Sequence, residues 1–226
     1  MIETATDGDV RVVTLDRPDR RNALTPAALD DLEAAIEAAE APVVYLRGAG
    51  SAFCAGADLD AVAALDGRDA AEAFARRGQE VAATIGDADA VVVAGVDGPA
   101  RGGGVELALA CDVRVATADA TFAETGATIG LFGAWGGTSR LPCVVGLGEA
   151  MDIALSGRVV DADAALRMGL VSRVVDEPRA VAAEIAGNDP AALRVIKTRL
   201  RDGASRNVQE RREAEAFADL HADFDR

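Results

Sequence analysis

The residues with the clearest potential for chemistry lie between Val91 and Asp112, where Glu106 closely follows three successive glycines, Gly102 to Gly104. The apolar run from Val91 to Val96 predicts a strand, followed by a glycine-rich loop and a helix with Glu106 in its first turn. Glycines let the backbone approach a bound group, and free N–H groups at a helix start favour negative charge. Glu106 is then placed to move a proton. The alternative is a tight turn whose carboxylate only suits the helix dipole.

A second copy of this arrangement occurs earlier in the chain. The apolar run from Val43 to Leu46 leads through Gly48-Ala49-Gly50 to the segment FCAGADL at Phe53 to Leu59. Each copy is typical of a strand, a glycine-rich loop and a helix. Stacked units of this kind would aim one backbone N–H from each loop at a single oxygen, which is the geometry of an oxyanion hole.

Hydrophobic periodicity predicts the elements that must hold these loops. Strands are expected at 10–15, 43–47, 91–96, 112–116, 121–122 and 170–175. Helices are expected from Pro26 to before Pro42, over 69–85, after Gly104, from near Gly137, in two short pieces after Gly148, and in a tail from Pro178 that restarts at Pro190.

The glycine-rich segment from Glu124 to Leu141 is expected to form the wall of a pocket rather than a free surface loop. Ile129, Leu131, Phe132 and Trp135 interleave with its glycines and would need burial.

Composition narrows the class of protein. The 226 residues, half of them apolar, predict one domain with a small appendage. A formal charge of −15 argues against nucleic acid or an anionic membrane surface as a partner. Lys197 is the only lysine and Asp outnumbers Glu, a pattern that indicates a halophilic source.

The chain contains neither a long apolar run nor a signal peptide, so we expect a cytoplasmic protein. Cys54, Cys111 and Cys143 are widely spaced in apolar contexts, which predicts small buried thiols rather than a disulfide framework or a metal site.

Four segments resemble the enoyl-CoA hydratase/isomerase, or crotonase, superfamily. They are RPDRRNAL at 17–24, FCAGADL at 53–59, GPARGGGVELALACD at 98–112 and SGRVVDADAALRMGLVSRVV at 156–175. They occur in the family's order and cover most of the chain to Val175. PAALRVIK at 190–197 is similar to the family's C-terminal helical segment.

The resemblance implies an α/β fold, a ClpP/crotonase-like spiral of ββα units with a helical C-terminal region. Residues 1–177 would form the core with the acyl-CoA site, and residues 178–226 would pack on the core or in trimer contacts. The implied assembly is a homotrimer or hexamer. The implied substrate is an acyl-CoA thioester, with coenzyme A as part of the substrate, no separate cofactor and no metal.

The resemblance also assigns roles to residues. The amides of Ala57 and Gly103 would hold the thioester oxygen, and Glu106 would be the general acid/base. The residues implied to line the substrate are Arg21, Ala23, Ala55, Gly56, Asp58, Leu59, Gly126 and Trp135.

One position departs from the family pattern. Hydratases of the family use two glutamates, and the second aligns with Gly126 in this chain. Glu124, two residues earlier, is a candidate replacement. The implied activity is that of a hydratase/isomerase-type lyase of fatty acid metabolism; the alternatives are a decarboxylase-type member and a non-catalytic acyl-CoA-binding relative.

His221 and Lys197 are two further candidate residues. His221 is the only histidine and lies in the tail, which argues against a serine peptidase of the related ClpP-like fold and indicates a surface residue. Lys197 is expected either to contact a CoA phosphate or to lie on a solvated helix face.

Overall fold

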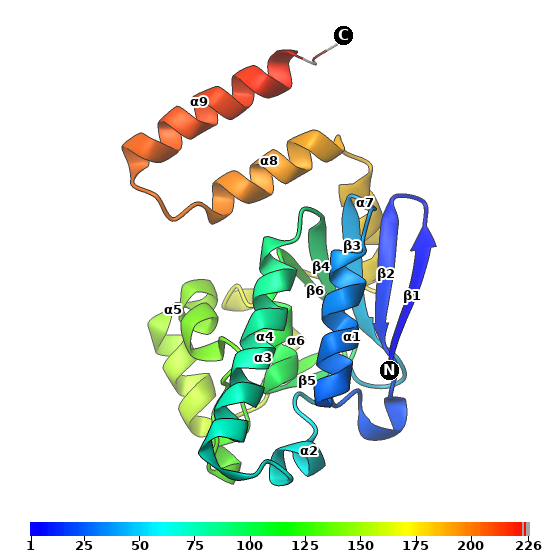
Figure 1. Cartoon of the computed structure of the whole chain (residues 1–226), viewed down its shortest axis with the longest axis vertical. Coiled ribbons are helices and arrows are strands. Elements are labelled where there is room, and N and C mark those ends of the chain that lie inside the picture. Colours follow the sequence, from blue (N-terminus) through cyan, green and yellow to red (C-terminus); the bar gives the residue numbers. More distant parts are fainter. Residues whose placement is uncertain (223, 225–226) are drawn as a thin grey trace.

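The computed structural model describes residues 1–222 and 224, and a six-stranded sheet lies at its centre (Figure 1). The sheet has the order β1-β2-β3-β4-β6-β9, in which β1 is antiparallel to β2 and the other neighbours are parallel. Its strands are β1 (Ile2–Asp7), β2 (Val10–Leu15), β3 (Val43–Gly48), β4 (Val91–Val96), β6 (Val113–Ala116) and β9 (Arg173–Val174). The fold is the mixed α/β arrangement that the sequence predicts.

Strand β1 is the one strand of this sheet without a sequence prediction. It forms a hairpin with β2 through Gly8, which has φ +57°. Five of its six side chains are exposed, so it lacks the apolar alternation that identifies a half-buried strand. The edge therefore forms by backbone pairing rather than by burial.

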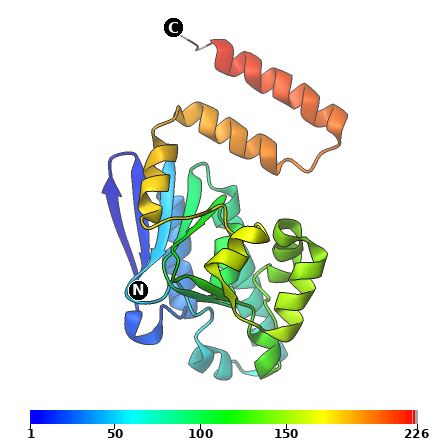
Figure 2. The same cartoon turned by 180° about the vertical axis from the view of Figure 1, so that it is seen from behind.

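Successive residues of the central strands face opposite sides of the sheet. Val44 and Leu46 pack in the main core against helices α1 (Pro26–Glu37), α3 (Gly67–Asp87) and α4 (Gly103–Ala110). Val43 and Tyr45 pack in a second cluster with Val181 of α7 (Pro178–Ala186). Figures 1 and 2 show the two layers, with α1 and α3 on one face and α7, golden in Figure 2, on the other. Burial on both faces explains the continuous apolar runs of β3 and β4.

The segments that connect the strands of the large sheet form a smaller sheet and several helices. The smaller sheet has the order β5-β7-β8. Its strands are β5 (Pro99–Arg101), β7 (Thr121–Ala123) and β8 (Val160–Asp161), and the accompanying helices are η1 (Pro18–Arg20), α2 (Leu59–Ala63), η2 (Gly126–Ile129), α5 (Gly137–Ser156) and α6 (Ala162–Arg167). The helix expected near Gly137 and the first of the two expected after Gly148 form the single element α5. This element breaks at Gly146, which has φ +79° and ψ 158°.

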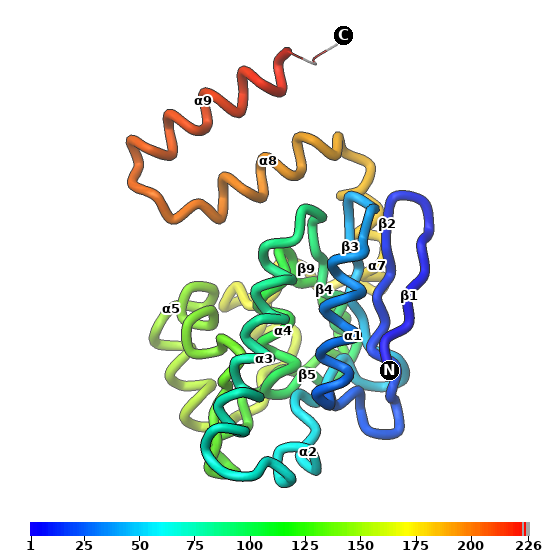
Figure 3. Tube along the Cα trace, viewed as in Figure 1, coloured from blue at the N-terminus to red at the C-terminus, as the bar shows by residue number. Residues whose placement is uncertain are grey.

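The remaining helices are α8 (Pro190–Arg201) and α9 (Arg206–Ala222). Figures 1 and 3 show α9 lying beyond α8, away from the sheet. None of the described residues of α9 is buried, and His221 is exposed, as expected. The division into residues 1–177 and 178–226 stays a prediction. No described helix combines the length and the apolar character that a membrane crossing requires.

Lys197 joins α8 to the body of the chain, so the expectation of a solvated helix face is wrong. Its side chain is 7% exposed, and its Nζ lies 2.9 Å from Asp112 Oδ2 and donates to the Ala90 carbonyl at 2.8 Å. Arg201 reaches the other oxygen of Asp112 at 2.8 Å. Two cations on α8 therefore share one carboxylate at the end of the sheet.

Replacing Lys197 by Met should lower the free energy of unfolding by about 1–3 kcal/mol, because the partly buried Asp112 carboxylate loses one of its two cations. Arg194→Met is the matched control, since it removes the same charge from an exposed position of the same helix. Chemical denaturation of both variants checks this. Equal unfolding midpoints for the two variants would contradict the assigned role.

Candidate functional site

The two glycine-rich loops lie against each other. Cys54 and Ala100 form a parallel bridge, and Arg101 N–H donates to the Cys54 carbonyl at 2.9 Å. A methyl group on Gly56, which has φ +86°, would lie only 2.8 Å from the backbone nitrogen of Gly103. The loops therefore meet where Ala57 follows Gly56 and where α4 begins at Gly103.

The segment RPDRRNAL fixes the first of these loops through Asn22. The Asn22 side chain, 1% exposed, donates to the carbonyls of Ala49, Ala52 and Phe53 and accepts the N–H of Arg17 at 2.9 Å. These bonds satisfy the buried amide, which would otherwise cost free energy. Asn22 itself has φ +60°, which an asparagine tolerates better than most residues. Asn22 is not among the site residues predicted from the sequence.

Asp58 ends the same loop and caps α2, accepting the N–H groups of Asp60 and Ala61. The Arg17 guanidinium that hydrogen-bonds to Asp58, together with those backbone N–H groups and Arg20, holds the pKa of the Asp58 carboxyl below its usual range. Asp58 is thus an ionised, fully partnered carboxylate that orders the loop.

Glu106 lies on α4 with its carboxyl buried at 2% exposure. Its Oε1 accepts the N–H of Trp135 at 2.7 Å and the N–H of Gly137, the first residue of α5, at 2.6 Å. Burial raises the pKa of Glu106, while the two N–H donors and the positive charge of Arg140 oppose that shift. Two amides, one at a helix N-terminus, therefore orient a carboxyl that burial makes more basic.

Trp135 braces this arrangement from behind. Its ring contacts α4 and α3 so closely that a methyl group on either Gly103 or Gly78 would clash with it. Phe74 packs edge-on against the ring, with centroids 5.7 Å apart. Gly78, which weakens the sequence-based prediction of α3, is the position that lets the indole in. The substrate contact assigned to Trp135 stays a prediction.

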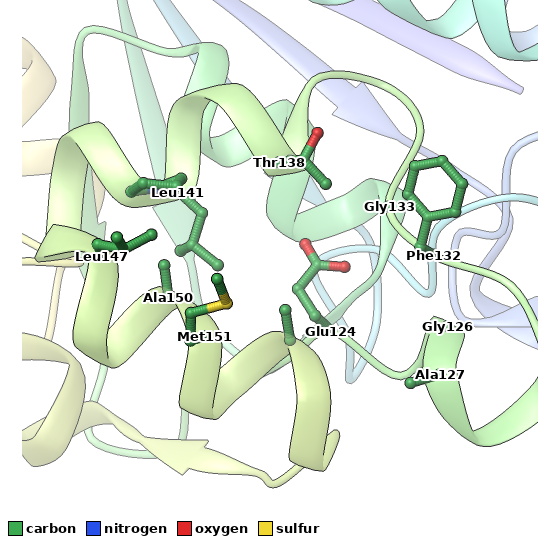
Figure 4. A pocket seen from close by; sticks show the side chains of 13 residues that line it. Glu124, Gly126, Ala127, Phe132, Gly133, Thr138, Leu141, Leu147, Ala150 and Met151 are labelled. Carbon is green, nitrogen blue, oxygen red and sulfur yellow. The ribbon is translucent and has the colours of Figure 1, made fainter.

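An apolar cavity of about 220 Å³ opens beside Glu106. Gly133 and Gly137, which adjoin the Glu106 carboxyl, line it. Its apolar wall consists of Phe132, Leu141, Pro142, Leu147, Ala150, Met151 and Ala154. Glu124 projects among these groups in Figure 4, with Leu141 and Met151 of α5 on one side and Phe132 on the other. The cavity therefore has a carboxyl in a lining that is apolar except for Thr138.

Glu124 comes directly after β7 and is 5% exposed, and neither of its carboxyl oxygens has a hydrogen-bond partner among the described residues. A methyl group on Gly133 would lie 3.0 Å from Glu124 Oε2 and 3.1 Å from Glu106 Oε1, so the two carboxyls border the same point. Burial, with a contribution from the negative charge of Glu106, raises the pKa of Glu124 to about 8. Two neighbouring buried carboxyls that titrate together hold one proton near neutral pH.

Gly126 lines the cavity but has no room for a side chain. A methyl group there would lie 2.7 Å from Phe132 Cα and 2.9 Å from Phe132 N. The loop that follows β7 therefore folds so that Glu124, and not position 126, presents a carboxyl to the cavity. The sequence-based expectation that Glu124, two residues before Gly126, is a candidate replacement rests on its nearness in the chain, and the structure places its carboxyl in the cavity.

The other predicted site residues cluster near the two loops. Arg21, at φ 52°, accepts the Ala55 N–H on its carbonyl at 2.9 Å; Ala23 is buried at 8% exposure and Leu59 is 57% exposed. Their contacts with a substrate stay predictions.

Two expectations about burial are wrong. Ile129, Leu131 and Phe132 are 55%, 49% and 69% exposed, because η2 and the turn after it lie at the rim of the cavity. Only Trp135 of that set is buried. Cys143 is exposed on α5, whereas Cys54 and Cys111 are buried.

Comparison with known proteins gives a consistent result. Residues 5–224 match the family described as Enoyl-CoA hydratase/isomerase. A protein of Rhizobium meliloti (strain 1021) named "Probable enoyl-CoA hydratase" is 40% identical over 178 residues, covering 77% of this chain and 68% of that protein. The Short-chain-enoyl-CoA hydratase of Clostridium acetobutylicum is 32% identical over 97% of this chain and 88% of its own length. The crystal structure of enoyl-CoA hydratase from Thermoplasma volcanium GSS1 has a TM-score of 0.92 at 31% identity, covering 98% of this chain and 92% of that one.

The raised pKa of Glu124 predicts a pH-dependent stability difference. The folded chain binds this proton more tightly than the unfolded chain. Between about pH 4.3 and 8 the unfolded chain has lost the proton and the folded chain keeps it, so the free energy of unfolding falls as the pH rises. Glu124→Gln should therefore become more stable relative to the unaltered protein, by up to about 1.4 kcal/mol per pH unit in that window.

Denaturation at a series of pH values and constant high salt measures this difference. Glu37→Gln, at an exposed position of α1, is the control for loss of one carboxylate. A Glu124→Gln difference that stays constant across the window would show that Glu124 does not titrate abnormally.

Proposed function

Because the chain belongs to the enoyl-CoA hydratase/isomerase family, whose members process thioesters, we propose that it converts an acyl-CoA through an enolate held between the Ala57 and Gly103 amides, with Glu106 as general acid/base. The observation that carries this proposal is the convergence of the two glycine-rich loops beside a buried, hydrogen-bonded Glu106. The activity class is a hydratase/isomerase-type lyase.

The chemistry follows from where charge develops. Proton transfer or addition next to a thioester places negative charge on the thioester oxygen. The nitrogens of Ala57 and Gly103 donate to no other group among the described hydrogen bonds, so both remain available for that oxygen. Fixed donors in a site shielded from water contribute about 3 kcal/mol each to such a transition state.

Glu106 is suited to the proton transfer. Its Oε1 is tied to two backbone amides, which fix the carboxyl plane next to the first turn of α4. Burial moves its pKa towards neutral pH, where a carboxyl exchanges protons most usefully. The wall of apolar side chains in the adjoining cavity suits an acyl chain.

The assembly belongs to the same proposal. Helix α8 exposes Ile196 and Leu200 at 54% and 83%, and α9 exposes Phe217 at 70%. The exposure of these large apolar side chains supports subunit contacts that would bury them, as in a homotrimer or hexamer.

The cellular setting is also part of the proposal. All three cysteines are free thiols, which supports a cytoplasmic location. The charge of −15 with a single lysine supports a halophilic source. A role in fatty acid metabolism follows from an acyl-CoA substrate.

The assignment of Glu106 predicts a large loss of rate on Glu106→Gln. Purified protein in high salt should convert at least one of crotonyl-CoA, a 3-enoyl-CoA and a malonyl-type CoA. Glu106→Gln should lower that turnover at least about a hundredfold, as expected when a general acid/base is removed. Glu37→Gln is the control, because it removes an exposed carboxylate at the end of α1, and it should keep the unaltered rate. Full activity of Glu106→Gln, or binding of every thioester without turnover, would contradict the proposal.

A further inference from the structure

Glu124 is a buried carboxyl that the proposed function leaves unused. The enolate requires only the two amides and Glu106. Yet Glu124 stands in the cavity next to Glu106, with both of its oxygens free of partners among the described residues. A carboxyl buried without a partner costs free energy, and the raised pKa of Glu124 reflects that cost. A functional use would account for it.

We propose that Glu124 is the second catalytic carboxyl of this site and that, paired with Glu106, it adds water across the double bond of a 2-enoyl-CoA. The inference deepens the proposed function and rests on it, because it needs the thioester oxygen to sit between the Ala57 and Gly103 amides. It selects hydration among the reactions that a single carboxyl leaves open.

The surroundings of the two carboxyls assign them different states. The charged groups that face the pair are the two carboxyls themselves and Arg140 on α5, which acts on Glu106. Glu106 has two N–H donors that stabilise an anion, whereas Glu124 has none among the described residues and is surrounded by Leu141, Met151 and Phe132. Glu106 is therefore the ionised base and Glu124 the carboxylic acid.

The proton balance of the reaction then closes within the pair. Glu106 takes a proton from water as the water oxygen bonds to the β-carbon, and the electrons of the double bond move to the thioester oxygen. Glu124 donates its proton to the α-carbon as the enolate electrons form the new C–H bond. The product is the 3-hydroxyacyl thioester. A proton then passes from Glu106 to the Glu124 carboxylate, which restores the starting state.

The cavity geometry supports Glu124 over position 126 as the source of this carboxyl. The backbone of Phe132 fills the space beside Gly126, whereas the missing side chain at Gly133 leaves space that both carboxyls border. Figure 4 shows the Glu124 carboxyl in the interior of the cavity, with Gly126 at its edge. The departure at Gly126 therefore relocates a carboxyl instead of removing it.

The test compares crotonyl-CoA hydration by the unaltered protein, Glu124→Gln and Glu124→Asp. Glu124→Gln keeps the size of the side chain but has no proton to give, so kcat should fall at least about a hundredfold with little change in KM. Glu124→Asp keeps the acid on a shorter side chain and should recover part of the loss. Glu37→Gln, exposed on α1, is the control for charge.

The pH profile separates an acid from a merely structural residue. In the unaltered protein, kcat should fall as the pH rises through about 8, where Glu124 loses its proton. The residual rate of Glu124→Gln should lack that fall. Circular dichroism of the variants identifies any loss of rate that is caused by unfolding. The rate of Glu124→Asp, which keeps a carboxylic acid, is compared with that of Glu124→Gln, which does not.

Two results would overturn this inference. If Glu124→Gln hydrates crotonyl-CoA at the unaltered rate, or if the protein converts only the 3-enoyl or malonyl-type thioester, Glu124 is not the second carboxyl, while the proposed function still stands. If no thioester is converted at all, the proposed function fails as well.

Discussion

Two carboxyls buried side by side in an apolar cavity cannot both be ionised cheaply, and much of the site follows from how the fold handles that conflict. The amides of Trp135 and Gly137 stabilise negative charge on Glu106, whereas the apolar wall around Glu124 favours a proton. In the proposed hydration, this difference lets one carboxyl act as the acid and the other as the base at the same pH. A fully solvated pair of glutamates would both be ionised near neutral pH and could not divide these roles.

The rest of the fold places this pair against the two glycine-rich loops that follow β3 and β5. Parallel strands β3 and β4 end at the same edge of the sheet, so the loops that follow them meet there. Asn22 and the Arg17–Asp58 ion pair fix the first loop, and the Trp135 ring fits against Gly103 at the start of the second. The same Trp135 supplies one of the two N–H donors to Glu106. Trp135 thus links the loop at Gly103 to the Glu106 carboxyl.

Much of this arrangement is predictable from sequence, and the failures have physical causes. The buried runs of β3 and β4 and the glycines before Glu106 identify the central loops, because burial and close approach restrict residue type. Strand β1 escapes because it pairs through its backbone and exposes its side chains. The loop after β7 escapes because its path depends on tertiary contacts, such as the Phe132 backbone beside Gly126. A candidate role for Glu124 is visible in sequence, but its burial beside Glu106 is not.

The shared charge of the two glutamates is the claim on which the division into acid and base depends. The most direct test is carbon-13 NMR of protein labelled at its glutamate side-chain carboxyls, with the Glu124 resonance assigned as the one lost in Glu124→Gln. The account predicts that this resonance titrates near pH 8. Titration near 4.3, as for a solvated glutamate, would contradict it.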